Sequence, residues 1–297
     1  MSPAVAEARD FDLTLPDGRR LRVHEAGDPR GKLVVYHHGT PMSGLLAGAW
    51  SIDAYERGIR LVGFDRPGYG GSDRHRGRAI SDVAKDVAHL ADALGVDRFY
   101  TWGMSGGGPH ALACAALPGE RVFAAASVAG IAPYDADGLD FLHGMGQDNL
   151  DEFGAATQSE TALRAYLAAQ RSELMSASAE GLREALASLL PDVDRVALTG
   201  DVAEFLWAAM VEGLGGGYEG WLDDDLAFVS PWGFELSSIG VPVLLVQGQQ
   251  DLMVPFPHGR WLAGQVGVST AQLLPDEGHL SLLARVGDVH AWLLDHG

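Results

Sequence analysis

The chain has 297 residues, 47% of them hydrophobic, a single cysteine and a formal net charge of −19. One cysteine excludes an intramolecular disulfide, and an acidic chain without a basic patch argues against nucleic-acid binding. No apolar run approaches the roughly 20 residues that span a bilayer, so we expect no membrane association. The first 15 residues lack an apolar signal segment, which predicts a cytoplasmic protein.

The predicted elements begin with a β-hairpin, in which residues 11–15 and 20–25 flank the turn Pro16-Asp17-Gly18-Arg19. Short apolar runs between turn residues predict further strands at 33–37, 61–64, 99–102 and 122–128. A helix is expected over 81–94, with Ser81 as its N-cap, and a second over 108–116. Two more strands, 241–248 and 271–274, follow near the C-terminus.

The long stretch between the strands at 122–128 and 241–248 has helical periodicity, as in 162–174 and 182–190. We therefore predict a core formed by residues 1–132 and 236–297, interrupted by a helical cap over 133–235. The cap contains 20 Asp and Glu but only four Arg. This charge is interpreted either as a solvated surface or as a field that favours cationic substrates, with Asp223-Asp224-Asp225 holding an ammonium group.

The segment Gly103-Met104-Ser105-Gly106-Gly107 lies between a predicted strand and a predicted helix. A Gly-x-Ser-x-Gly turn in that context presents its serine at the top of a parallel sheet, and small residues on either side allow the tight turn. Ser105 is therefore the candidate nucleophile. A serine hydroxyl needs a base to take its proton.

Candidate partners follow later in the chain. Asp251 comes directly after the predicted strand 241–248, and His279 follows the strand 271–274. The carboxyl ends of parallel strands share one edge of the sheet, so these residues are expected to meet Ser105. His279 would act as the base and Asp251 would orient it, with Asp135 as an alternative acid. The backbone N–H groups of Gly106 and Thr40 are the expected oxyanion hole.

These motifs, together with His38-Gly39-Thr40-Pro41 and Asp65-Arg66-Pro67-Gly68-Tyr69-Gly70-Gly71-Ser72, resemble the serine branch of the α/β-hydrolases. The resemblance implies an eight-stranded, mostly parallel sheet with a helical cap. It also implies ester or amide-type hydrolysis without metal or cofactor. We interpret the chain as a hydrolase that cleaves a small ester or related acyl compound through an acyl-enzyme. Ser105 argues against epoxide hydrolases and haloalkane dehalogenases, which use an aspartate nucleophile.

Several alternatives within the fold keep the same three residues. They are an aminopeptidase-like enzyme, a carbon–carbon bond hydrolase, a perhydrolase or haloperoxidase, and a weakly catalytic ligand receptor. Aromatic residues of the cap are expected to supply part of an apolar pocket, but the sequence does not indicate which ones. The partner expected is a small-molecule substrate; the sequence leaves the substrate residues and the oligomeric state open.

Overall fold

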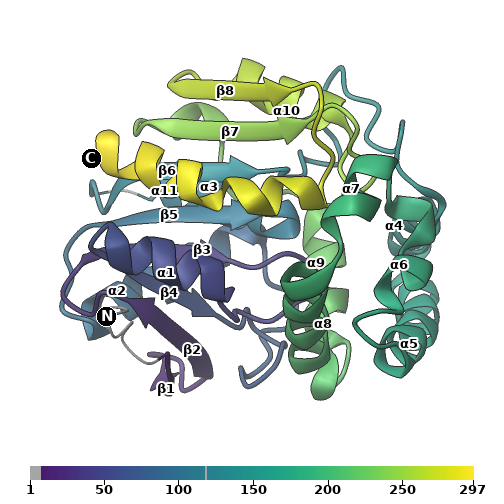
Figure 1. Cartoon of the computed structure of the whole chain (residues 1–297), viewed down its shortest axis with the longest axis horizontal. Helices are drawn as coiled ribbons and strands as arrows, with labels where there is room; N and C mark the ends of the chain where they lie inside the picture. The colour runs from purple at the N-terminus through teal and green to yellow at the C-terminus, as the bar shows by residue number, and fades with distance from the viewer. Residues whose placement is uncertain (1–7, 118) are drawn as a thin grey trace.

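The computed structural model describes residues 8–117 and 119–297, so residues 1–7 of the N-terminal stretch considered above lie outside it. One eight-stranded sheet has the order β1-β2-β4-β3-β5-β6-β7-β8 (Figure 1). β2 pairs antiparallel with β1 and β4, and every other pairing is parallel. This confirms the predicted mostly parallel sheet. The strands are β1 Arg9–Thr14, β2 Arg20–Gly27, β3 Lys32–His37, β4 Ile59–Phe64, β5 Phe99–Met104, β6 Val122–Val128, β7 Val243–Gly248 and β8 Ser269–Leu274.

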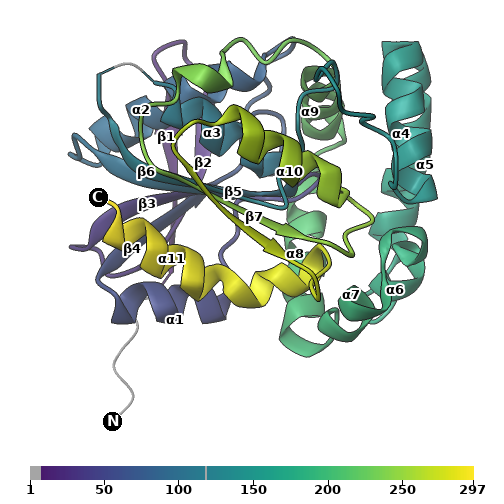
Figure 2. The ribbon, with the colours of Figure 1, turned by 90° about the horizontal axis from the view of Figure 1, so that it is seen from above.

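Helices cover both faces of the sheet (Figure 2). One face packs against α1 (Gly48–Glu56) and α11 (Val286–Asp295), the other against α2 (Val83–Ala93), α3 (Gly108–Ala115) and α10 (Phe256–Gln265). Side chains of a strand alternate between the faces. In β3, Val34 and Tyr36 join one hydrophobic cluster, and Leu33 and Val35 join the other. The central strands are therefore apolar on both sides, as buried parallel strands require.

Residues 133–235, called the helical insertion below, connect β6 to β7. Their helices lie at the end of the sheet toward which the parallel strands point (Figure 1). They are α4 Gln147–Gln158, α5 Glu160–Ser176, α6 Leu182–Ala185, α7 Asp192–Ala197, α8 Gly200–Gly215 and α9 Glu219–Phe228. Among the residues described, no helix combines the length and apolarity needed to cross a membrane.

The predicted helix start at Ser81 is wrong. Residues Ile80–Asp82 form a 3-10 turn, and α2 begins at Val83. The backbone N–H of Ser81 donates to the carbonyl of Trp232 (2.9 Å), and the Asp82 carboxylate accepts from the N–H of Ala79 (3.0 Å). A long-range contact with the segment after α9 therefore decides this helix start, where local capping preference favoured Ser81.

Candidate active site

Ser105 lies at the turn between β5 and α3, with φ of 55°. Residues other than glycine rarely adopt this left-handed conformation, so the turn is strained. Glycines make the turn possible: a Cβ atom on Gly103 would collide with the carbonyl of Gly107, and one on Gly107 would collide with the carbonyl of His37. The half-buried serine is thus held at the carboxyl end of the central strands.

His279 and Asp251 are both buried and hydrogen-bonded to each other, with 2.7 Å between Nδ1 and Oδ2. Asp251 is itself oriented, because Oδ1 accepts from the N–H groups of Met253 and Val254, each at 2.8 Å. Burial opposes protonation of His279, but the charge and hydrogen bond of Asp251 outweigh it and raise the pKa of the imidazole. With Nδ1–H directed at Asp251, neutral His279 has an acceptor lone pair on Nε2. Asp135, the alternative acid, is exposed.

The loop after β3 lies against the turn that carries Ser105. A Cβ atom on Gly39 would be 3.6 Å from Cβ of Ser105, and one on Gly106 would collide with Oγ1 of Thr40. Among the described residues, the backbone N–H of Thr40 has no acceptor. The structure therefore brings Thr40 and Gly106 together beside the serine, where two N–H donors can face one oxygen atom.

The buried carboxylate of Asp224, in the helical insertion, supports this loop. The sequence indicated Asp224 only as one member of an acidic cluster. Oδ2 of Asp224, on α9, accepts from Thr40 Oγ1 (2.8 Å), Arg66 Nη2 (2.6 Å) and Tyr69 Oη (2.8 Å). Nη1 of Arg78 lies 2.8 Å from Oδ1. Burial alone would raise the pKa of Asp224, but Arg66 and Arg78 hold it well below its usual range.

The expectation that Asp223-Asp224-Asp225 forms an ammonium site is therefore wrong for two of its three residues. Asp223 forms a double hydrogen bond with Arg74, at 2.7 and 2.8 Å, and Asp224 pairs as described above. Asp225 alone of the three lines the cavity that contains Ser105. No local pattern indicates these pairings, because Arg66 and Arg74 lie about 150 residues away from their aspartates in the chain.

One cavity of about 140 Å³ contains both Ser105 and His279. Five of its lining residues are aromatic or methionine side chains of the helical insertion, as expected: Phe153, Tyr166, Met210, Trp221 and Phe228. Three carboxyl groups line it as well, those of Asp148, Glu152 and Asp225, whereas no Lys or Arg is among the lining residues described. The cavity is thus apolar with a negative polar end.

Two of those carboxyls form a hydrogen-bonded pair, the half-buried Glu152 on α4 and the buried Asp225 on α9. Trp221 Nε1 donates to Glu152 Oε1 at 2.7 Å. Among the described residues, neither oxygen of Asp225 accepts a hydrogen bond from a donor group. Burial raises the pKa of both acids. Repulsion by Glu152 and their shared hydrogen bond raise the pKa of Asp225 further, whereas hydrogen bonds with Trp221 and Asp225 partly offset the rise at Glu152. The pair can therefore retain one proton near neutral pH.

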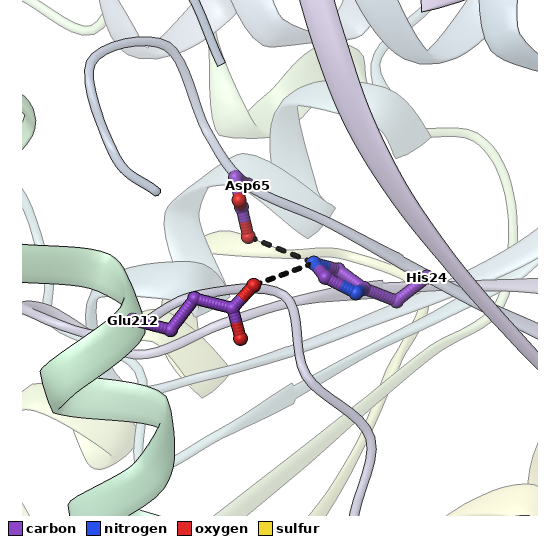
Figure 3. A group of neighbouring side chains, drawn as sticks. All are labelled: His24, Asp65 and Glu212. Atoms are coloured by element: carbon purple, nitrogen blue, oxygen red, sulfur yellow. Dashed lines mark hydrogen bonds and ion pairs between the residues drawn. The ribbon is translucent and has the colours of Figure 1, made fainter. Parts of the chain in front are cut away.

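A second polar cluster, His24, Asp65 and Glu212, joins the core to α8 (Figure 3). His24 Nε2 lies 3.1 Å from Asp65 Oδ1 and 4.0 Å from Glu212 Oε1. Both Asp65 oxygens already accept backbone N–H groups, from Gly44 (2.8 Å) and Gly71 (2.9 Å). Burial opposes the charge on His24, but Asp65 and Asp10 raise its pKa. Because a metal ligand must be a neutral imidazole, this cluster fits an ion pair better than a metal site.

The family model described as "alpha/beta hydrolase fold" matches residues 32–285. The chain belongs to the α/β-hydrolase family.

Individual relatives of this α/β-hydrolase have diverse activities. A non-heme chloroperoxidase of Streptomyces lividans is 27% identical over 250 residues, covering 82% of this chain and 83% of that protein. A proline iminopeptidase of Xylella fastidiosa is 36% identical over 125 residues, which is 40% of this chain and 39% of the relative. The solved structure of an esterase from Exiguobacterium antarcticum superposes with a TM-score of 0.71 and 21% identity, covering 97% of this chain and 98% of that one. At that identity the structural likeness supports the fold only.

Proposed function

We propose that this α/β-hydrolase is a cofactor-independent serine hydrolase that cleaves small esters or related acyl compounds through an acyl-enzyme. One observation carries the proposal. The hydrogen-bonded pair His279–Asp251 and the strained Ser105 belong to loops after different strands, and His279 and Ser105 line the same cavity. A nucleophile, a base and a group that orients the base are the parts that acyl transfer requires.

In the proposed mechanism Nε2 of His279 takes the hydroxyl proton of Ser105 while Oγ attacks the carbonyl carbon. The N–H groups of Gly106 and Thr40 hold the oxyanion, and loss of one such donor costs about 2.7–4 kcal/mol in comparable enzymes. His279 returns the proton to the leaving alcohol as the ester C–O bond breaks. Water deprotonated by His279 then attacks the acyl-enzyme, and the proton passes to Ser105 as the acid departs.

The helical insertion serves in this proposal as a cap over the cavity, and its apolar side chains receive the acyl group. The three carboxyls and the lack of Lys or Arg in the described lining disfavour anionic substrates. This weighs against a carbon–carbon bond hydrolase acting on carboxylate substrates.

The decisive experiment is hydrolysis of p-nitrophenyl acetate, butyrate and octanoate by wild type, Ser105→Ala and His279→Ala. A matched control is Ser230→Ala, which removes an exposed hydroxyl after α9. We expect both active-site variants to lose nearly all turnover and the control to retain it. Turnover that survives Ser105→Ala would refute the proposal, and ligand binding without turnover would point to a receptor.

A second candidate, an aminopeptidase-like hydrolase, is favoured by the Glu152–Asp225 pair. A carboxyl pair in the cavity lining with unfilled acceptor sites suits an ammonium group, which would displace the shared proton. The matched substrates are alanine p-nitroanilide and its N-acetyl derivative, assayed with wild type, Asp225→Asn and the exposed control Asp151→Asn. This candidate is supported if wild type and Asp151→Asn prefer the free amine, if Asp225→Asn abolishes that preference, and if added salt weakens it. Equal rates on both substrates exclude it.

A further inference from the structure

Asp194, on α7 of the helical insertion, is a fully buried carboxylate outside the three residues of the proposed mechanism. Its Oδ2 accepts the backbone N–H of His279 at 2.7 Å, and its Oδ1 accepts the N–H of Ser281 at 2.9 Å. Gly278 is in close contact with it, because a Cβ atom there would lie 2.5 Å from both carboxylate oxygens. The insertion therefore holds the loop of the proposed base through one side chain.

The two N–H groups that Asp194 accepts begin a 3-10 helix, Leu280–Arg285, for which His279 is the N-cap residue. The first N–H groups of a helix have no partner within it and require an outside acceptor. The side chain of His279 itself makes no such cap hydrogen bond. Asp194 supplies the missing acceptor from 85 residues away, and its negative charge is favourable at a helix start.

The same carboxylate acts on the charge of the imidazole. Burial and the nearby Asp251 raise the pKa of Asp194, while the N–H groups of Ser281 and His279 lower it. Asp194 in turn adds to Asp251 in raising the pKa of His279 against the effect of burial. The charged and titratable groups acting on His279 are thus Asp251 at its ring and Asp194 at its backbone.

Segments beside both partners of the Asp194 contact contribute to the lining of the cavity. Leu186 and Leu189 precede α7 by a few residues, and Leu280 and Leu283 belong to the 3-10 helix after His279. A substrate in the cavity would therefore lie beside the contact that holds the loop of His279, where small displacements of a catalytic group are costly.

We propose that Asp194 is a positioning residue that holds the loop of the base His279 in place from α7, so that catalysis depends on this contact between the helical insertion and the core. This inference rests on the proposed serine mechanism. It requires that loss of Asp194 lower kcat while KM changes little, because Asp194 does not line the cavity.

The test compares Asp194→Asn with Asp192→Asn, which removes the same charge from an exposed position on the same helix. We expect Asp194→Asn to lower kcat for p-nitrophenyl butyrate about 10- to 100-fold, as misplacement of a catalytic group does. The acidic limb of its kcat profile should move to lower pH, because a negative charge near His279 is lost. Asp192→Asn should change neither kcat nor the pH profile of kcat.

A second variant covers the case in which Asp194→Asn does not fold. Gly278→Ala introduces a methyl group against the carboxylate without changing its charge, and Gly240→Ala, where a Cβ atom meets nothing within 4 Å, is the control. We expect Gly278→Ala to lower kcat and Gly240→Ala to leave it unchanged. If wild type is active and Asp194→Asn and Gly278→Ala have the same kcat as their controls, the inference about Asp194 is wrong while the proposed function stands. If wild type shows no turnover that depends on Ser105, the proposed function itself is wrong.

Discussion

Asp224 is expected to be among the most costly residues of the chain to replace. Asp224 and Arg66 are both 0% exposed. Asp224→Asn removes the charge that Arg66 and Arg78 neutralise. The single amide oxygen cannot replace both carboxylate oxygens, since Oδ2 accepts four hydrogen bonds and Oδ1 faces Arg78. Each buried donor left without an acceptor costs about 1–3 kcal/mol. Local relaxation makes such losses less than additive, so we expect about 3–5 kcal/mol, as for other broken buried ion pairs.

The assay is urea denaturation at pH 7, followed by tryptophan fluorescence, with Asp223→Asn as the matched control. Asp223 neighbours Asp224 on α9 and is also buried, but its partner Arg74 is 27% exposed and water can solvate the guanidinium when the carboxylate is lost. The loss of Asp223 should therefore cost only about 1 kcal/mol. The double variant Arg66→Met/Asp224→Leu should be more stable than the sum of its single variants predicts, because Arg66 is no longer left as a buried charge without its carboxylate and only Arg78 loses its partner. If Asp224→Asn lowers the free energy of unfolding no more than Asp223→Asn does, this account of the buried cluster is wrong.

Three further outcomes are expected. Asp251→Asn should lower kcat by about 10⁴-fold through the wrong imidazole tautomer while ester binding persists; near-normal turnover would mean that another acid holds the role. Gly106→Ala should abolish turnover in a folded protein, because its methyl group collides with Thr40 beside the proposed oxyanion hole. The raised pKa of His24 means that its pairing with Asp65 stabilises the fold below pH 6.5 and that this contribution is lost as pH rises through the higher folded value. The free energy of unfolding measured in urea should therefore fall more between pH 6 and pH 9 in wild type than in His24→Asn.

Local patterns predicted most of the sheet. The hairpin around Pro16-Asp17-Gly18-Arg19 and the strands β3 to β8 fall where short apolar runs and turn residues placed them. The range 182–190, predicted from its periodicity, instead forms the short α6 and a 3-10 turn, Ala187–Leu189. Helix α1 was not predicted; only Trp50 and Ala54 of its nine residues are buried, which leaves a weak periodic signal.

Some residues of the candidate site could also be predicted from the sequence, whereas the roles of others could not. Ser105, Asp251 and His279 could be chosen from sequence because each follows a strand, and parallel strands bring such loops to one edge. The Asp and Glu residues of the insertion could be counted from the sequence, but their roles could not be assigned. Whether an aspartate meets solvent, an arginine or the cavity depends on packing between distant segments, and Asp223, Asp224 and Asp225 differ in this respect although they are adjacent.

The sequence by itself determined the order of the elements, the strained turn at Ser105 and the three residues proposed for catalysis. These follow from periodicity, glycine placement and the chemistry of each side chain, all of which are local. Only the tertiary structure decided that Asp224 supports the loop of Thr40 and that Asp194 holds the loop of His279. Both contacts join the insertion to the core across 85 or more residues, and no local pattern records which buried donor a carboxylate will meet after folding.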